Sequence, residues 1–568
     1  MYRGAHATPA ASSASCLPSS LEAVILNRFY DIAQIVDGPR APDEPPKDPP
    51  GGGVPGAGDV PPGDASIEIV PGELARMCRE AEAQLAQEPP ILFQRGHKIV
   101  RPDEVEVDFA NGNKGYVPSL HIQTAHGVYR ALAERTRWKK YDGRKRRLMS
   151  CDPPDKISLM IANGQGQWRL PQISGVTSCP TLRPDGSLLY APGYDQATGI
   201  FNFWTLGDLG IPSRPSRSDA EEGLSDLQHL ISEVPFVSDV DRAVILSGLI
   251  SPVVRGAMSV CPLHAITSPS PGSGKSFLVD LCAMVATGRR CPVQHASLDE
   301  VETEKRIVAA VLGGYSIVSL DNANHEIKSD LLCQALERPL IQLRALGSSA
   351  ISEVENRACF YATGNGFCVS GDLVRRTLLC RIDPKMERPE TRRFDLNPLT
   401  TVERDRKRYV RSALIIVRAF LDSGETLDLV PIGSFEDWTR TVRSALVWLG
   451  VPDPADAIQT SRENDSALLA LCSILTFLVD VFGGAPFSVA DVINVNSSAG
   501  LDEPDKQASK YRAEFREIIL SVAGVRGKMN GRRLSTWFDR NTGRFVGGAR
   551  IERDEPDKHT KARRWKVV

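Results

Sequence analysis

The stretch ITSPSPGSGKSFLVDL, residues 266 to 281, constrains the fold of this chain more than any other part of its sequence. Gly274, Lys275 and Ser276 fill three of the four fixed positions of the phosphate-loop pattern G-x-x-x-x-G-K-[ST], and Pro269 stands at the first. The apolar run PLHAIT precedes the loop, and the helix-like run SFLVDLCAMVA follows it. This order of strand, loop and helix predicts a nucleotide-binding α/β layer; the alternative is a surface turn that happens to contain a lysine.

The chemistry of the loop depends on a few side chains. Glycines at 272 and 274 let the backbone curl so that successive N–H groups point at a phosphate, and the following helix adds its positive N-terminal end. Lys275 is expected to reach the β- and γ-phosphates of ATP, and the Ser276 hydroxyl is expected to bind Mg²⁺. The residues predicted to contact the nucleotide are Pro271, Gly272, Ser273, Gly274, Lys275, Ser276 and Phe277.

A second segment, YSIVSLDNANHE (315–326), predicts the acidic partner of this loop. It reads as a buried strand that ends at Asp321, the position from which a carboxylate binds Mg²⁺ in nucleotide hydrolases. Asn322 follows where many ATPases carry Glu, so the water-activating base is open, and Glu326 is the nearest spare carboxylate. The alternative is a strand that ends in a solvated Asp-Asn turn.

Two later segments have a similar pattern. RACFYATGNG places Asn365 after an apolar strand, where a neutral amide would orient an attacking water. GDLVRRTLLCRID places Arg375 and Arg376 before another apolar strand, and an arginine delivered to a γ-phosphate stabilises transition-state charge. The alternative for the arginines is a basic pair on the surface.

Composition sets the broad class. A chain of 568 residues suggests three or four domains, and a net charge of −2 with 42% hydrophobic residues is ordinary for a globular protein. The sequence has no run of about 18 apolar residues and no basic-then-apolar leader, so we expect a cytoplasmic protein without a membrane segment. Twelve cysteines occur singly, without a C-x-x-C pair, which favours reduced thiols over disulfides or a zinc site.

Composition shifts along the chain predict four parts. Residues 1–65 form an arm and a Pro/Gly-rich linker, with one amphipathic helix over 20–36. Residues 66–225 have mixed helix and strand patterns, residues 226–455 alternate helices with short apolar strands before a helical lid, and residues 456–568 end in a strand-like tail.

The last 63 residues are strongly basic, since residues 506–568 hold 17 Lys and Arg against 7 Asp and Glu. Within them Leu534, Trp537 and Phe538 recur at helical spacing, and the basic hairpin-like tail follows. Helices followed by a basic hairpin form a winged helix, which binds duplex DNA through side chains off the apolar face. These are Arg532, Arg533 and Arg540. The alternative is a winged helix used for protein contact.

Taken in order, SPGSGKS, IVSLDN, YATGNG and GDLVRRTLLCRID resemble the helicase halves of phage, plasmid and integrated-element primase-helicases, which are AAA+ ATPases allied to superfamily 3. The resemblance covers roughly residues 66–568. It implies an α/β fold: an AAA+ P-loop ATPase core, a mixed N-terminal domain and a C-terminal winged-helix domain. Pro269 and Asn322 depart from the commonest ATPase pattern.

The resemblance also implies roles for single residues. Lys275 and Ser276 would bind phosphate and Mg²⁺, and Asp321 would be the Walker B acid. Asn365 would be the sensor, and an arginine at 375 or 376 would be the finger given to the next subunit of a homo-oligomeric ring, by family analogy a hexamer. Related motors insert a DNA-gripping pore hairpin where this chain has residues 338–357, which makes Arg344 and Arg338 candidates for contact with single-stranded DNA.

These features predict an ATP-dependent DNA helicase or origin-melting motor that replicates a mobile genetic element. The alternative is an initiator or loader switch that binds DNA through the winged helix without translocating. A third interpretation is a nucleotide-dependent regulator of a nuclease or transcription complex. The chain lacks the acidic motifs of known primases, so a primase would be a separate protein, and a separate replication initiator is a further candidate partner.

Overall fold

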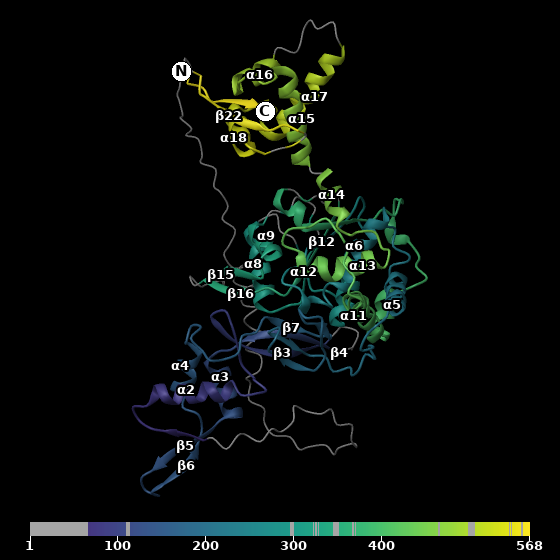
Figure 1. Cartoon of the computed structure of the whole chain (residues 1–568). Helices are drawn as coiled ribbons and strands as arrows, with labels where there is room; N and C mark the ends of the chain where they lie inside the picture. The colour runs from purple at the N-terminus through teal and green to yellow at the C-terminus, as the bar shows by residue number, and fades with distance from the viewer. Residues whose placement is uncertain are drawn as a thin grey trace, which may run out of the picture. The chain divides into compact units, whose positions relative to one another are not determined.

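The computed structural model describes most of the chain beyond its N-terminal arm (Figure 1). The described residues are 66–108, 114–295, 300–321, 323, 327, 329–344, 351–365, 369, 371–463, 466–497, 506–544, 546, 548–557 and 561–568. They all belong to one compact unit, Pro62–Val568. The arm predicted for residues 1–65, with its helix over 20–36, lies outside the described residues.

The first part, residues 66–170, is called the N-terminal module here. Three helices pack on a three-stranded sheet of order β1-β5-β6 around Trp138, whose side chain is 2% exposed. The strands are β1 (Ser66–Ile69), β5 (Arg137–Asp142) and β6 (Arg147–Cys151), and the helices are α2 (Leu74–Leu85), α3 (Ala125–Arg135) and α4 (Asp155–Ala162). The module therefore combines helices and strands, as the mixed pattern of residues 66–225 predicts.

A second small sheet of order β2-β3-β4 begins within the same stretch and packs on strands that follow it. Its strands are β2 (Phe93–Arg95), β3 (Lys98–Asp108) and β4 (Lys114–Ile122), and the later ones are β7 (Gly175–Thr177), β10 (Gly193–Asp195) and β11 (Ile200–Asn202). Between them, β8 (Thr181–Leu182) and β9 (Leu188–Leu189) form a separate two-stranded sheet. The buried Arg95 guanidinium donates to the carbonyls of Ser174 (2.7 Å), Val311 (2.6 Å) and Glu355 (3.2 Å). Burial lowers the pKa of Arg95 to about 10. One cation thus ties three distant backbone segments together.

The central module contains a five-stranded sheet in which every strand pair is parallel. Its order is β13-β14-β17-β12-β18, so the strand before the phosphate loop lies between two others. The strands are β12 (Leu263–Ser268), β13 (Val293–His295), β14 (Ile317–Asp321), β17 (Cys359–Asn365) and β18 (Thr377–Arg381). The molecule is therefore a mixed α/β protein with a parallel sheet, as the sequence predicts.

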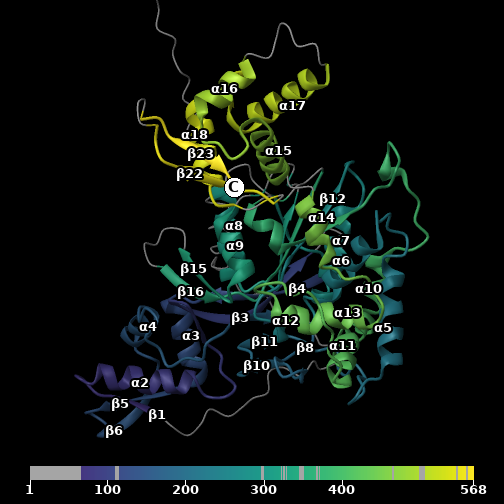
Figure 2. The same ribbon diagram turned by 45° about the horizontal axis from the view of Figure 1, so that its top comes forward.

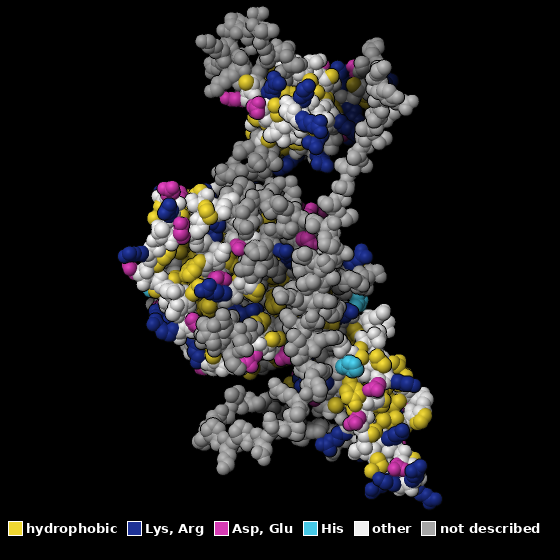
Figure 3. Space-filling model, turned by 180° about the vertical axis from the view of Figure 1, so that it is seen from behind, with side chains coloured by type: hydrophobic (Ala, Val, Ile, Leu, Met, Phe, Trp, Pro, Cys, Tyr) yellow, Lys and Arg dark blue, Asp and Glu magenta, His cyan; other side chains and the backbone are white. Residues whose placement is uncertain are grey.

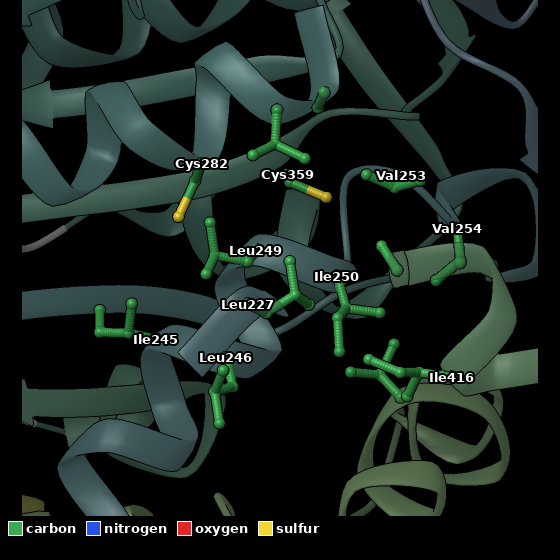
Figure 4. Packing of buried hydrophobic residues seen from close by; sticks show 14 of the residues in the cluster. Leu227, Ile245, Leu246, Leu249, Ile250, Val253, Val254, Cys282, Cys359 and Ile416 are labelled. Carbon is green, nitrogen blue, oxygen red and sulfur yellow. The ribbon is translucent and has the colours of Figure 1, made fainter. Parts of the chain in front are cut away.

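Both faces of this sheet are buried, because residues of one strand alternate between two separate cores. On β12, Leu263 and Ala265 pack with α8 and α9, whereas Ile266 packs with α6 and α7. Figure 2 shows where these four helices lie around the sheet. Figure 4 shows the larger core, to which Leu227, Ile250 and Ile416 contribute from three helices and Cys282 from a fourth. The helices are α5 (Arg217–Leu230), α6 (Asp239–Ile250), α7 (Lys275–Thr287), α8 (Glu300–Leu312), α9 (Asp330–Glu337), α10 (Pro398–Arg404) and α11 (Arg406–Ser423).

The borders of the central module differ from the predicted ones by one helix at each end. The predicted border between residues 225 and 226 falls inside α5, whose Leu224 and Leu227 pack in the same core. The predicted border between residues 455 and 456 places α14 (Asp456–Glu463) outside the central module, yet its Ala457 and Ile458 also pack in that core. Composition does not mark these borders, because both helices are amphipathic and their partners lie far away in the sequence. The helices between α11 and α14 are α12 (Glu436–Trp438), a π-turn (Thr439–Arg443) and α13 (Ser444–Trp448).

Along the chain, an antiparallel hairpin lies between the strand that ends at Asp321 and the strand that ends at Asn365. It consists of β15 (Leu340–Arg344) and β16 (Ile351–Glu355). Ile341, Leu343 and Val354 face the core, while their neighbours along the strands are exposed or half-buried. The tip, residues 345–350, lies outside the described residues.

The C-terminal module has a core of its own around Phe487, Phe538 and Trp565. Four helices surround an antiparallel sheet of order β19-β23-β22. The elements are α15 (Ser466–Phe482), β19 (Phe487–Ser488), α16 (Val489–Ser497), α17 (Lys506–Ala523), β20 (Gly524–Val525), β21 (Lys528–Met529), α18 (Gly531–Asn541), β22 (Ile551–Asp554) and β23 (Arg564–Val567). The tail hairpin predicted from the sequence is present as β22 and β23.

Within the described part of the chain, each cysteine is a free thiol, and most are buried. No helix among the described residues combines the length and the apolar character needed to cross a membrane.

A buried histidine lies on the central strand of the parallel sheet. His264 Nε2 is 2.9 Å from Ser247 Oγ on α6, and the ring stacks on Tyr361 with centroids 5.4 Å apart. Desolvation lowers the pKa of His264 from 6.5 to about 3, against a smaller opposing effect of the Pro262 backbone. His264 therefore stays neutral when the folded protein is moderately acidified.

This neutrality predicts a pH-dependent stability. Below pH 6.5 the unfolded chain takes up a proton at His264 that the folded chain rejects until about pH 3, so folding is weakened as pH falls through this window. Between pH 6.5 and 5 the loss is up to about 2 kcal/mol of unfolding free energy. Apparent melting temperatures of the parent and His264→Gln should therefore converge on acidification. A constant difference between the two melting temperatures at every pH would mean that the folded protein protonates His264 as readily as the unfolded chain does.

Candidate functional site

The phosphate-loop motif forms a tight turn between β12 and α7. Gly272 and Gly274 have φ angles of 69° and 94°, a region that residues with a side chain rarely adopt. A Cβ at position 272 would also lie 3.3 Å from a Glu390 carboxylate oxygen. The glycines thus let the backbone curl before the helix, as the motif predicts. Pro269 is exposed at the strand exit, and Pro271 is exposed within the turn.

Lys275, the first residue of α7, points back into the loop. Its Nζ donates to Asn365 Oδ1 (2.6 Å), Ser273 Oγ (3.0 Å) and the Ser270 carbonyl (3.1 Å). The residue is 9% exposed. Desolvation lowers the pKa of Lys275, and the nearby Asp321 carboxylate opposes that shift. The three hydrogen bonds of this buried ammonium all go to neutral oxygens, which only partly offset the cost of removing its charge from water. An anion placed beside it would therefore bind favourably through charge-assisted hydrogen bonds.

Ser276 and Asp321 come together beside this lysine. Ser276 Oγ donates to Asp321 Oδ1 at 2.9 Å, and the Thr363 hydroxyl makes a short hydrogen bond to the same oxygen. A hydroxyl and a carboxylate are hard oxygen donors of the kind that Mg²⁺ prefers. The predicted metal-binding pair, Ser276 and Asp321, is therefore assembled as a set that fits this ion.

The sheet explains why residues about 90 positions apart meet. In the parallel register Ser268 of β12 lies beside Asn365 of β17, and β14 on the other side of β17 ends at Asp321. The carboxyl ends of these strands lie at one edge, next to the position where the strand order reverses, and ligands bind there in open α/β sheets. Thr363 was not predicted from the sequence, although it is two residues before Asn365 and so faces the same side of the strand.

A cavity of about 440 Å³ adjoins the loop. From the motif it is lined by Gly272, Ser273, Gly274 and Phe277. The opposite wall is largely apolar and comes from the end of α5 and from residues 389–398, including Phe394, with the Arg392 guanidinium 4.8 Å from the Phe394 ring centre. This wall was not predicted from the sequence, because residues 389–398 show no periodic pattern.

The two candidate arginines differ sharply in environment. Arg376 has a 3% exposed side chain that pairs with Glu337 (2.6 Å) and Asp372 (3.0 Å). The Arg375 side chain is 46% exposed, with Asp372 at 3.2 Å and Glu337 at 3.9 Å. Arg376 thus anchors the turn before β18 to α9, whereas Arg375 lies at the surface.

Other predicted site residues lie apart from this cluster or outside the described residues. Asn322 and Glu326 are outside the described residues. Arg344 and Arg338 are exposed, at the end and just before the start of β15 respectively.

The predicted DNA-binding arginines lie on α18 of the C-terminal module. Arg532, Arg533 and Arg540 are exposed, while Leu534 and Phe538 on the same helix are fully buried. The Asn530 side chain caps this helix at the Arg533 amide (3.0 Å). The amphipathic helix predicted from the spacing of Leu534, Trp537 and Phe538 is therefore present.

Comparison with known proteins identifies no family. No protein-family model matches the sequence, and no curated protein matches it. The apo C-terminal region of NrS-1 aligns with 74% of this chain and 91% of its own at 13% identity and a TM-score of 0.33, and a second structure of that region gives 74%, 92%, 15% and 0.32. An acetamide complex of JCV helicase aligns with 43% of this chain and 74% of its own at 11% identity and a TM-score of 0.19. Likenesses this low carry no argument, so a function for this chain has to rest on the geometry of its own site.

The contrast between the two arginines predicts unequal losses of stability when each is replaced. Arg376→Gln leaves Glu337 and Asp372 without their buried partner and should cost about 2 kcal/mol, less than for a fully enclosed pair because both carboxylates are partly exposed. Arg375→Gln should change stability by no more than about 0.5 kcal/mol. Thermal melts of the two variants test this, and equal losses would contradict it.

Proposed function

We propose that this chain is an ATP-dependent DNA helicase or origin-melting motor that replicates a mobile genetic element. The observation that carries the proposal is the buried Lys275 ammonium, which is surrounded by neutral oxygens next to the Ser276 and Asp321 pair. A triphosphate with its metal ion is the ligand class that matches a recessed cation beside hard oxygen donors at a helix N-terminus.

On this proposal, Lys275 exchanges the Asn365 and Ser273 oxygens for phosphate oxygens, which form stronger charge-assisted bonds. Ser276 and Asp321 would hold Mg²⁺, which supplies charge neutralisation on the phosphates. Thr363 holds the Asp321 carboxylate in place through its hydroxyl. Asn365, released by Lys275, would then be able to orient water by its amide.

The cavity beside the loop supports a nucleotide rather than a simple phosphate. Its apolar wall, with Phe277 and Phe394, suits the flat face of a base, and its volume of about 440 Å³ is in the range of small-ligand pockets. ATP would thus span from this cavity to Asp321 along the loop.

Two features favour a motor over a switch. The β15-β16 hairpin is inserted in the chain between the acid strand and the Asn365 strand and carries the exposed Arg344, so the two strands that end at the site are connected through it. Arg375 is exposed close to the rigid Arg376 anchor, which suits a group offered to a neighbouring subunit of a ring. In this proposal the hairpin contacts single-stranded DNA in the pore and α18 contacts duplex DNA as part of a winged helix.

Paired variants at the site test hydrolysis and motor action together. Lys275→Ala should abolish ATP turnover and weaken ATP binding, because the charge facing the phosphates is removed. Asp321→Asn should bind ATP with turnover reduced by at least about a hundredfold. The parent should displace a strand from a forked duplex only with ATP. Turnover by Lys275→Ala within twofold of the parent would exclude this site, and parental hydrolysis without strand displacement would favour the non-translocating initiator or loader.

Mixing two inactive variants tests whether the site is shared between subunits. Arg375→Ala should bind ATP but turn over slowly, because its loss affects only transition-state charge. Mixed with Lys275→Ala, it should regain activity, since some interfaces then combine an intact loop with an intact arginine. The control mixes Lys275→Ala with the double variant Lys275→Ala/Arg375→Ala, which should give no rescue because no subunit then carries an intact loop. Failure of rescue, with mixed assemblies verified by mass photometry, would show a self-contained site.

A further inference from the structure

The β5-β6 hairpin of the N-terminal module is the most basic short segment in that module. Residues 137–147, RWKKYDGRKRR, contain seven Lys and Arg and one Asp, a surplus of six positive charges. The basic residues are Arg137, Lys139, Lys140, Arg144, Lys145, Arg146 and Arg147. Figure 3 shows Lys and Arg side chains gathered at this end of the module.

The hairpin extends beyond the sheet that anchors it. Strand β1 pairs with β5 only as far as Lys140, whereas β5 and β6 remain paired to Asp142 and Arg147. The buried Trp138 fixes the base of the hairpin in the module core. The tip is therefore a two-stranded ribbon held on a packed support.

The single acidic residue of the tip is used to build the turn. The Asp142 carboxylate accepts hydrogen bonds from the backbone amides of Arg144 (2.9 Å) and Lys145 (3.2 Å). Arg146 adopts a φ of 51°, a conformation that glycine or asparagine reaches at lower cost. Position 146 therefore carries an arginine although its backbone conformation favours glycine or asparagine.

The cations of the hairpin lack the acidic partners that some other cations of the module have. Elsewhere in the module Arg76 pairs with Glu80, and Arg101 and Arg130 pair with Glu134. No basic side chain of residues 137–147 forms an ion pair with another described residue, and all four at the tip, Arg144 to Arg147, are exposed. A rigid set of exposed, unneutralised cations is a surface that a polyanion fits.

We propose that the β5-β6 hairpin binds the phosphate backbone of duplex DNA. Three of the four tip cations are arginines, whose planar fork matches phosphate oxygens, and a two-stranded ribbon is narrow enough to lie along or in a major groove. A lipid surface fits less well, because the tip from Asp142 to Arg147 contains no apolar side chain to insert. Tyr141, 56% exposed, pairs across the ribbon with Leu148 and lies next to the tip, where it can pack on the sugar-phosphate backbone.

This contact lies on different elements from α18 and from the β15-β16 hairpin, and it does not depend on the proposed ATPase activity. It would give the N-terminal module a grip on DNA without nucleotide. A failure of the ATP experiments therefore leaves this inference standing, and its own failure leaves the ATP site untouched.

Salt-dependent binding of the full chain to a short labelled duplex of arbitrary sequence tests the inference. The hairpin variant carries Arg144, Lys145, Arg146 and Arg147 changed to Gln, and the matched control carries Arg79, Lys98, Arg130 and Lys156 changed to Gln. The two variants have equal net charge, and the control residues are exposed on the same module. The hairpin variant should bind at least about tenfold more weakly, with the log–log salt slope flattened by about 0.9 for each phosphate that the hairpin no longer neutralises. The control should retain most of the affinity.

Two further arms distinguish the hairpin from the α18 arginines and from a lipid-binding surface. In a background with Arg532, Arg533 and Arg540 changed to Ala, the hairpin effect on the slope should persist at the same size, because independent sites add. Arg146→Gly removes one charge while relieving its backbone conformation, so it should weaken DNA binding without lowering the melting temperature. Equal losses of affinity in the hairpin and control variants would overturn the inference, as would unchanged DNA binding with loss of binding to phosphatidylserine vesicles.

Discussion

The central constraint in this molecule is the placement of one ammonium group. Lys275 lies almost buried at the start of α7, and its three hydrogen bonds join the loop to the end of β17. Burying a cation among neutral oxygens costs free energy that an anionic ligand would recover. The turn glycines, the parallel strands and the Asp321 carboxylate all serve to hold this group where such a ligand can reach it, so the same contacts define the fold and the candidate site.

The parallel sheet brings the ends of distant sequence segments together at one edge. Alternate residues of β12 and β17 are divided between two cores, which fixes the strands so firmly that the polar residues at their ends have little freedom. Arg95 adds a second constraint, because it binds carbonyls at the end of α8 and at the end of β16 in the β15-β16 hairpin. A shift of the hairpin therefore requires either breaking buried charge-assisted bonds or moving the strand that carries Arg95 with it.

Positive charge is distributed by module rather than by the chain as a whole. A net charge of −2 conceals two concentrated basic surfaces, one on the β5-β6 hairpin and one in the residues from α17 onward. Each is carried by elements anchored in a separate aromatic core, around Trp138 in one case and Phe538 with Trp565 in the other. With the candidate ATP site, they would give the proposed motor two polyanion-binding surfaces and a nucleotide-driven centre.

Local sequence was enough to predict the strand, loop and helix around Lys275. It also predicted the strands that end at Asp321 and Asn365 and the amphipathic α18. Each of these depends on local periodicity and on residues with special backbone or ligand chemistry. Three other facts came from the packing alone: Thr363 holds Asp321, residues 389–398 form the cavity wall, and Arg376 is an anchor while Arg375 is exposed. These facts depend on partners that lie tens to hundreds of residues away. The run of cations at 137–147 is visible in the sequence, but whether carboxylates neutralise it is set by packing, since a charge pattern does not specify which side chains become neighbours.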